Sequence, residues 1–213
     1  MAQPFTHPDD LSAILHRADA PAILDMRDAE DAAADPRRIP GAVPVELAAL
    51  EARDWPAVPT ICTCQKGGKL SQLGAGILRA RGVPATSMPG GHLAWVARGL
   101  PLRSAAPLAG RWVMPPDPGW DDLCALWVLR RLVDRSAPVM AVERDWLARA
   151  AESWPAEPLP GTPAAMAATA DLDHPALAHL AGGPERLLAG RLARVDAPEA
   201  ALDLIDDWLE GAA

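Results

Sequence analysis

The chain has 213 residues, of which 50% are hydrophobic and 23% charged, the composition of a globular protein with one large or two small domains. Its formal net charge is −8, and no apolar run reaches the ~18 residues that a membrane-spanning helix needs. These features argue against a membrane protein and against a nucleic-acid-binding protein, which usually presents a basic face.

The first half of the chain predicts alternating helices and strands. A first helix is expected over residues 8–17, with Thr6 as its N-cap, because apolar side chains recur there at helical spacing. Short apolar runs predict strands at 21–26, 59–63 and 85–88, with an extended piece after the turn at 39–44. Further helices are expected at 70–81 and 92–98. This alternation is typical of an α/β fold, with a parallel sheet flanked by helices.

The charge changes along the chain. Residues 1–105 hold 11 acidic and 11 basic side chains, whereas residues 106–213 hold 17 acidic and 9 basic ones. We therefore expect two domains, at 1–105 and 111–213, joined by a linker at 106–110 that is rich in small residues. The second domain is expected to be mainly helical, with helices at 121–134, 144–154, 175–192 and 198–209, a strand at 139–142 and a loop at 155–169.

One segment carries a chemical signature, namely a cysteine between a strand and a helix. Cys64 ends the strand, a loop containing Gly67 and Gly68 follows, and a helix starts at once. This order turns backbone N–H groups toward the sulfur and places it at the positive end of a helix, which favours a thiolate. The only two lysines of the chain, Lys66 and Lys69, add positive charge beside it. The segment predicts an anion-cradling loop with a nucleophile at its base.

Four motifs in the same order make residues 8–103 resemble a single rhodanese domain, a sulfurtransferase fold. They are Asp25-Met26-Arg27, the turn Ile39-Pro40-Gly41-Ala42, the loop from Cys64 to Lys69, and the closing segment with Pro89-Gly90-Gly91, Trp95 and Gly99-Leu100-Pro101. Two positions depart from the family pattern: Arg38 stands where His is common, and Lys69 where Arg is usual.

The resemblance implies an enzyme that transfers sulfur through a persulfide on Cys64, with thiosulfate or a persulfide as donor and a thiol or cyanide as acceptor. It implies no metal and no cofactor. It also implies that the sulfur lies in a cradle of backbone N–H groups formed by Gln65, Lys66, Gly67, Gly68, Lys69 and Leu70. By the same resemblance, Asp25 and Arg27 support the loop from below, and Ser71 lies at the helix start close to the persulfide.

Two other functions are compared with sulfur transfer. Related phosphatases carry Arg six positions after the cysteine, where this chain has the apolar Leu70, so phosphatase activity is disfavoured. The alternative to catalysis is a sensor module that binds an oxyanion or a partner in a chromate or sulfur stress response, with little turnover. It is suggested by Lys69 and by residues 123–134, which resemble the signature helix of the chromate-resistance protein C-terminal domain. There Trp127, Arg130, Arg131 and Asp134 match in spacing, while the cysteine, Cys124, is displaced by one position.

Other reactive side chains have simpler interpretations. Cys62 and Cys124 are expected to pack in cores, with a resolving-thiol role for Cys62 as the alternative. His92 is expected at a helix start or on the surface. The pair Arg130-Arg131 is expected to pair with Asp134 or with Asp121-Asp122, or else to bind an anion. The histidines show no zinc-type spacing. Three cysteines cannot form a disulfide framework, so a cytoplasmic location is expected, and no secretory signal is evident.

Overall fold

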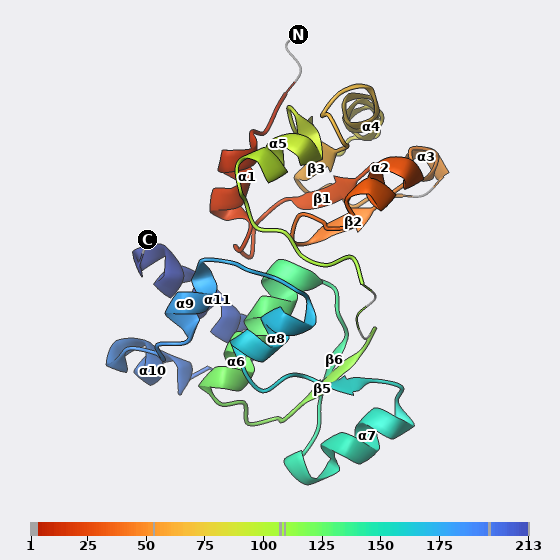
Figure 1. The fold of residues 1–213 in the computed structure, drawn as a ribbon. Coiled ribbons are helices and arrows are strands. Elements are labelled where there is room, and N and C mark those ends of the chain that lie inside the picture. Colours follow the sequence, from red (N-terminus) through yellow and green to blue (C-terminus); the bar gives the residue numbers. More distant parts are fainter. Residues whose placement is uncertain (1–3, 53, 107, 109, 196, 213) are drawn as a thin grey trace. The chain divides into compact units, whose positions relative to one another are not determined.

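The computed structural model describes residues 4–52, 54–106, 108, 110–195 and 197–212. They form two compact units with a boundary between Ala105 and Ala106 (Figure 1). The expected linker includes Pro107 and Ala109, which lie outside the described residues. Within the described ranges, none of the helices has both the length and the apolar character needed to cross a membrane.

The first unit is a four-stranded parallel sheet with helices on both faces, which confirms the fold class expected for this half. The sheet order is β2-β1-β3-β4, and every neighbouring pair is parallel. The strands are β1 (Ala22–Asp25), β2 (Ala42–Pro44), β3 (Thr60–Thr63) and β4 (Ala85–Ser87). The helices are α1 (Pro8–Ile14), α2 (Ala29–Ala34), α3 (Ala49–Ala52), α4 (Lys69–Ala80) and α5 (Gly91–Ala97).

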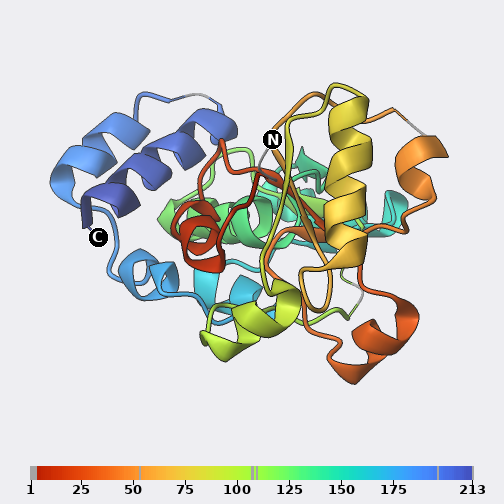
Figure 2. The same ribbon diagram turned by 90° about the horizontal axis from the view of Figure 1, so that it is seen from above.

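Both faces of this sheet are buried, and alternate residues of a strand serve opposite faces. Leu24 and Cys62 point into the core beneath α3 and α4. Ile23 and Ile61 point into the core shared with α1 and α5. Figure 2 shows α4 on one side of the strands and the α1 and α5 pair on the other. The carboxyl ends of β1 and β3 therefore meet at one edge of the sheet, where binding sites of parallel sheets usually form.

The entry into α1 differs from the sequence prediction. Its N-cap is His7 rather than Thr6, and His7 makes no capping bond with its side chain. The reason is a competing partner: Phe5 pairs with Ser87 as a short parallel bridge, and the Thr6 hydroxyl lies 2.8 Å from that of Thr86. The chain before α1 therefore pairs with β4 at the edge of the sheet. The short helices α2 and α3 were also not predicted from the sequence.

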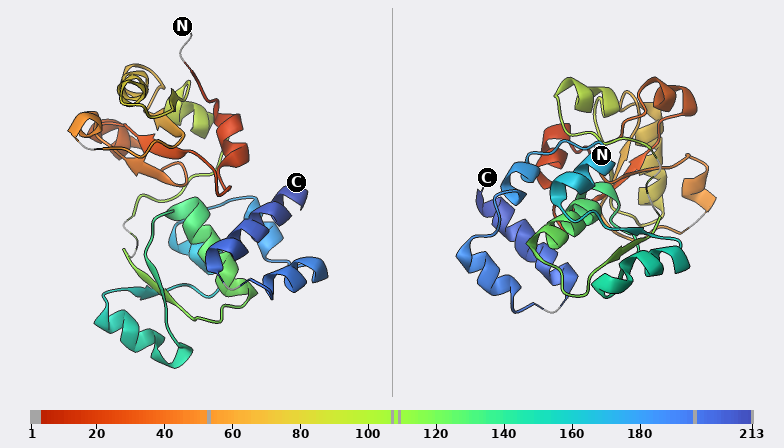
Figure 3. Two further views of the ribbon diagram at one scale, coloured as in Figure 1. Left: turned by 180° about the vertical axis from the view of Figure 1, so that it is seen from behind. Right: turned by 60° about the horizontal axis from the view of Figure 1, so that its bottom comes forward.

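The second unit is mainly helical, as expected. Its core is built around α6 (Trp120–Trp127), which continues directly into a π-helical turn, η1 (Val128–Val133). This long helical element packs against α8 (Pro163–Thr169) and α11 (Pro198–Ala212) (Figure 3). The other helices are η2 (Arg144–Trp146), α7 (Leu147–Ser153), α9 (Ala176–Leu180) and α10 (Arg186–Leu192).

This unit also contains a three-stranded parallel sheet, of which the sequence predicted one strand. The strands are β5 (Trp112–Met114), β6 (Val139–Ala141) and β7 (Glu157–Pro158), in the order β6-β5-β7. Two expected segments change: the loop 155–169 contains β7 and α8, and the helix 175–192 is broken between α9 and α10. The break contains Gly183 at a φ of +78°, a conformation that ends a helix.

Arg131 does not pair with the acidic residues that its own helix offers, which corrects the sequence prediction. Its guanidinium lies 2.9 Å from Asp203 and 2.9 Å from Asp206, both on α11. The buried Asp206 carboxylate also accepts a 2.6 Å hydrogen bond from Trp127 Nε1. Arg130 donates to the carbonyl of Arg135 at 2.9 Å. This cluster joins η1 to α11 within the core, so a structural role accounts for Arg131.

Candidate active site

Cys64 lies directly after β3, at the carboxyl edge of the first unit's sheet, and is only 6% exposed. Its thiol donates to Ser71 Oγ at 3.3 Å, and the Ser71 hydroxyl donates to the carbonyl of Gly68 at 3.2 Å. Ser71 belongs to the first turn of α4, where its side chain is fully buried. The sulfur is therefore held between the end of a strand and the start of a helix, and Ser71 is its polar neighbour.

The loop around the sulfur offers a set of free hydrogen-bond donors. Within the described part of the chain, no backbone N–H of residues 65–71 donates to a backbone carbonyl, and the first such donor is Gln72, which bonds to Gly68 at 3.1 Å. These N–H groups belong to the loop and to the first turn of α4, where a helix has unsatisfied donors. Lys66 and Lys69 are exposed on the same segment. The segment has the donors and the charge that an anion needs.

Two glycines allow the loop to pack closely against the start of α5. Gly67 has a φ of +63°, and a Cβ there would lie 2.5 Å from the Gly90 nitrogen and 2.6 Å from the Gly91 nitrogen. Gly91 has a φ of +57°, and a Cβ there would overlap the carbonyl of Cys64. Side chains rarely adopt this left-handed conformation, and here they would also collide with backbone. Glycine at both positions is thus a requirement of the loop's shape.

The contact between the loop and α5 is made by backbone hydrogen bonds. The N–H of His92 donates to the carbonyl of Cys64 at 2.9 Å, and that of Leu93 donates to the carbonyl of Gln65 at 3.0 Å. Both donors belong to the first turn of α5. Two carbonyls of the loop are therefore bonded to α5.

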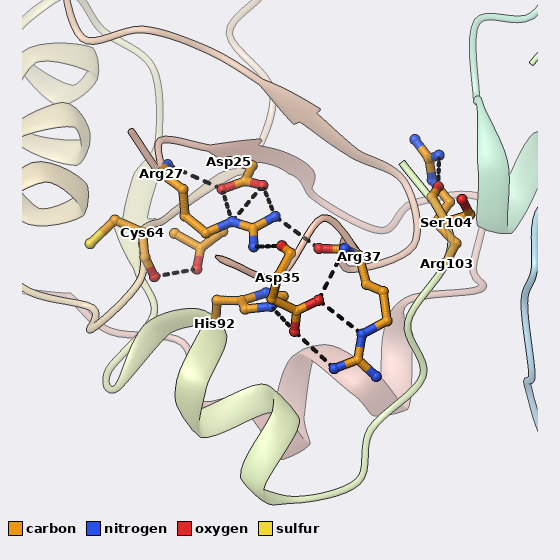
Figure 4. Close-up of polar contacts among 9 residues, drawn as sticks. Asp25, Arg27, Asp35, Arg37, Cys64, His92, Arg103 and Ser104 are labelled. Carbon is orange, nitrogen blue, oxygen red and sulfur yellow. Dashed lines mark hydrogen bonds and ion pairs between the residues drawn. The ribbon is translucent and has the colours of Figure 1, made fainter. Parts of the chain in front are cut away.

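Asp25, the last residue of β1, forms a buried ion pair with Arg27 (Figure 4). Arg27 Nη2 lies 2.8 Å from Asp25 Oδ2, and the two side chains are 1% and 7% exposed, respectively. The guanidinium also donates to the carbonyls of Asp35 and Arg37, at 2.7 and 2.8 Å. Arg27 thus donates hydrogen bonds to the segment 35–37 rather than to the cysteine loop.

A second polar cluster was not expected from the sequence, and His92 belongs to it. The His92 side chain is 2% exposed, and its Nε2 lies 3.1 Å from Asp35 Oδ2. Arg37 donates to the same carboxylate through Nε and Nη2, at 2.9 and 2.8 Å (Figure 4). These hydrogen bonds from Arg37 hold the pKa of Asp35 well below its usual range. Burial lowers the pKa of His92, and the bond to Asp35 opposes that shift. The sequence predicted that His92 lies at the start of a helix, but it did not predict the contact of the His92 side chain with Asp35.

The other two cysteines, Cys62 within β3 and Cys124 within α6, are both fully buried. Cys62 is fully buried beneath α4, and burial raises the pKa of its thiol to about 12. This agrees with its interpretation as a packing residue. Cys124 is also fully buried, and burial raises the pKa of its thiol. Among the described residues, no group of three or more His, Cys, Asp or Glu side chains is arranged to hold a metal ion.

Comparison with known proteins finds matches for the first unit of the chain. Residues 7–98 match the model of the rhodanese-like domain family. The solved structures that resemble the chain include the thiosulfate sulfurtransferase of Pseudomonas aeruginosa, at 26% identity and a TM-score of 0.43. That match covers 50% of this chain and 20% of the Pseudomonas protein. A rhodanese homolog from Thermus thermophilus is 30% identical, with a TM-score of 0.34, and the match covers 42% of this chain and 98% of that one.

A third similar structure is a protein of unknown function from Rhodopseudomonas palustris, described as a possible tyrosine phosphatase. It is 24% identical, with a TM-score of 0.41, and the match covers 46% of this chain and 83% of that one. None of the curated proteins compared with the chain matches it. The matched family residues end at 98, so the likeness of the second half to a chromate-resistance domain stays a prediction.

Proposed function

Residues 7–98 are a rhodanese-like domain, and from that premise we propose that the protein is a sulfurtransferase whose nucleophile is Cys64. The observation that carries the proposal is the position of the Cys64 sulfur at the base of a loop whose N–H groups, from residue 65 to 71, bond to no backbone carbonyl in the described part of the chain. A persulfide anion formed there could bind N–H donors that no backbone carbonyl already occupies. Lys66 and Lys69 would draw an anionic donor toward the loop.

The proposed reaction has two steps, both on the sulfur of Cys64. The thiolate attacks the outer sulfur of thiosulfate, an S–S bond forms, and the S–S bond of thiosulfate breaks to release sulfite. The enzyme then carries a persulfide, Cys64–S–S⁻. In the second step a thiolate or cyanide attacks the outer sulfur and takes it away, as a new persulfide or as thiocyanate, which restores the Cys64 thiolate. Neither step needs an external oxidant or reductant.

Ser71 has a supporting role in this proposal. Its hydroxyl is the polar group in contact with Sγ, at 3.3 Å, and it is oriented by Gly68. An O–H group that turns toward the sulfur can stabilise the thiolate before the attack and the leaving thiolate after transfer. Asp25 and Arg27 would act at a distance, by holding residues 35–37 in place.

Intact-protein mass spectrometry tests the proposal. The protein is incubated with thiosulfate and then with cyanide, and we expect the gain of one sulfur atom at Cys64 followed by its loss as thiocyanate. Cys64→Ser should gain no sulfur. Cys62→Ser is the matched control, because it changes a buried thiol two residues before Cys64, inside β3, and it should load sulfur normally. Sulfur loading by Cys64→Ser, or none by the native protein with Cys64 confirmed reduced, would contradict the proposal.

The second candidate is an oxyanion-binding sensor with little turnover. It is favoured by the same N–H groups of residues 65–71, which need no thiol in order to hold an anion. Isothermal titration of Cys64→Ser with thiosulfate, sulfate and chromate separates the two functions. Binding retained in this variant, together with a native protein that loads no sulfur, would favour the sensor.

A further inference from the structure

The first turn of α5 is bonded to two parts of the first unit at once, and His92 makes both connections. Through its backbone, His92 donates to the carbonyl of Cys64 at 2.9 Å. Through its side chain, it reaches Asp35 Oδ2 at 3.1 Å (Figure 4). A single buried residue therefore links the cysteine loop to the segment that follows α2.

The backbone connection decides where the loop's N–H groups point. A peptide unit is planar and trans, so its carbonyl oxygen and its N–H hydrogen point in opposite directions. The carbonyl of Cys64 is turned toward His92, and so the N–H of Gln65 is turned away from α5. The carbonyl of Gln65 is bonded to Leu93, which orients the N–H of Lys66 in the same manner. These are the first two donors after the sulfur-bearing residue.

The side-chain connection is held from several sides. The Asp35 carboxylate accepts from Arg37 Nε at 2.9 Å and from the Arg37 N–H at 3.1 Å. The Asp35 carbonyl accepts from Arg27, whose guanidinium is fixed by the buried Asp25 carboxylate. Because each member is bound by a charged neighbour, Asp35 offers His92 a fixed acceptor.

We propose that His92 is a positioning residue for the reaction at Cys64. Its imidazole bonds to Asp35 and so holds the first turn of α5 in place. The backbone N–H groups of that turn hold the two peptide units that orient the N–H groups of Gln65 and Lys66. His92 acts through the backbone and takes no part in bond making. The inference rests on the proposed sulfur transfer, and it adds to that proposal the residue that sets the geometry of the cradle.

The test compares two substitutions of His92 in the full chain. His92→Gln keeps an N–H donor at a similar reach, whereas His92→Leu keeps the bulk and loses the donor. We expect His92→Leu to lower kcat for sulfur loading from thiosulfate by about tenfold to a hundredfold, since small displacements of positioned groups have effects of this size. Its KM should change less than about threefold, and His92→Gln should keep kcat within the same factor. Val83→Ala, which removes packing beyond the end of α4 in the opposite core, should leave kcat unchanged below its melting temperature.

Hydrogen exchange supplies a readout that does not depend on activity. The amides of residues 92 and 93 should exchange about tenfold or more faster in His92→Leu than in the native protein, and at nearly native rates in His92→Gln. If His92→Leu does not fold, Asp35→Ala replaces it, because it removes the acceptor and keeps the backbone carbonyl that Arg27 binds.

Two results would overturn the inference. One is native exchange and native kcat in His92→Leu. The other is an equal loss of kcat in His92→Leu and His92→Gln while both amides stay protected, which would give His92 a role other than positioning. Failure of the proposed function looks different: the native protein itself would load no sulfur. The exchange rates, with the rate of Cys64 alkylation by iodoacetamide, would then decide whether His92 orients the loop.

Discussion

Gly67→Ala should destabilise the first unit by far more than an ordinary surface substitution. Two effects combine at this position. Alanine at a φ of +63° costs about 1 kcal/mol in backbone conformation. The new Cβ would also lie 2.5 Å from the Gly90 nitrogen and 2.6 Å from the Gly91 nitrogen, so the backbone must shift by roughly 1 Å to restore normal contact. Overpacking of this kind costs about 1–3 kcal/mol. The expected loss is about 3 kcal/mol, the sum of the two effects.

The chain offers two matched controls for this prediction. Gly82 has a φ of +82°, and a Cβ added there would meet nothing within 4 Å, so Gly82→Ala isolates the conformational cost of about 1 kcal/mol. Gly76 lies inside α4, and a Cβ there would meet only Arg79 Nη2, at 3.9 Å, so Gly76→Ala should leave stability unchanged or raise it by up to about 1 kcal/mol.

Hydrogen–deuterium exchange of the β3 amides, Thr60–Thr63, measures the opening free energy of the first unit separately from the second. We expect the order Gly67→Ala, Gly82→Ala, Gly76→Ala from the largest loss to the smallest. Gly67→Ala should also load less sulfur at temperatures where it stays folded, because the loop must move to admit the methyl group. Equal losses in Gly67→Ala and Gly82→Ala would refute the reasoning, since the close packing against Gly90 and Gly91 would then have no energetic effect.

Three further outcomes are expected. Arg27→Met should lower the free energy of unfolding of the first unit by about 3–5 kcal/mol, measured by urea denaturation, because it leaves the buried Asp25 carboxylate without its partner. Cys62 should resist iodoacetamide at pH 8 in the native protein, since a pKa of about 12 leaves roughly one thiol in ten thousand ionised, and peptide mapping should find it modified only after unfolding in urea. The free energy of unfolding should fall as the pH drops below about 6.5, because His92 binds a proton more readily in the unfolded chain than in the folded one. In the folded chain, burial lowers the pKa of the imidazole more than the contact with Asp35 raises it. Unfolding measurements over a pH series should show this fall in the native protein, and His92→Gln should lack the contribution of the imidazole.

The architecture of the first unit could be predicted because its signals are local. Continuous apolar runs such as those at 21–26 and 59–63 predict buried parallel strands, and the glycines and prolines between elements mark the turns. The order of strand, cysteine, glycine-bearing loop and helix also predicted the place of Cys64 at the strand end, and the resemblance to a rhodanese domain implied that Ser71 lies close to it. The structure has the two side chains in contact.

The second unit shows where local signals fail. Strands β5 and β7 have three and two residues, too few for a periodic pattern, and they are defined by their pairing with each other. Arg131 had acidic candidates on its own helix, but it pairs with Asp203 and Asp206, which lie 72 and 75 positions further along the chain. Tertiary packing places the buried Asp206 carboxylate next to the Arg131 guanidinium. An ion pair with a buried carboxylate at a fixed distance is stronger than one with an exposed neighbour on the same helix.

The sequence by itself determined the setting of Cys64, because the strand, the loop and the helix follow each other without interruption and their geometry is that of the backbone. What only the tertiary structure decided is how that loop is held. His92 and Asp35 are 57 positions apart in the sequence, and neither spacing nor composition predicts their contact. Thr6 likewise does not cap α1, because its hydroxyl forms a hydrogen bond with that of Thr86, which is 80 positions away in the sequence. Long-range polar contacts depend on which surfaces the fold brings together, and that is a property of the packed chain.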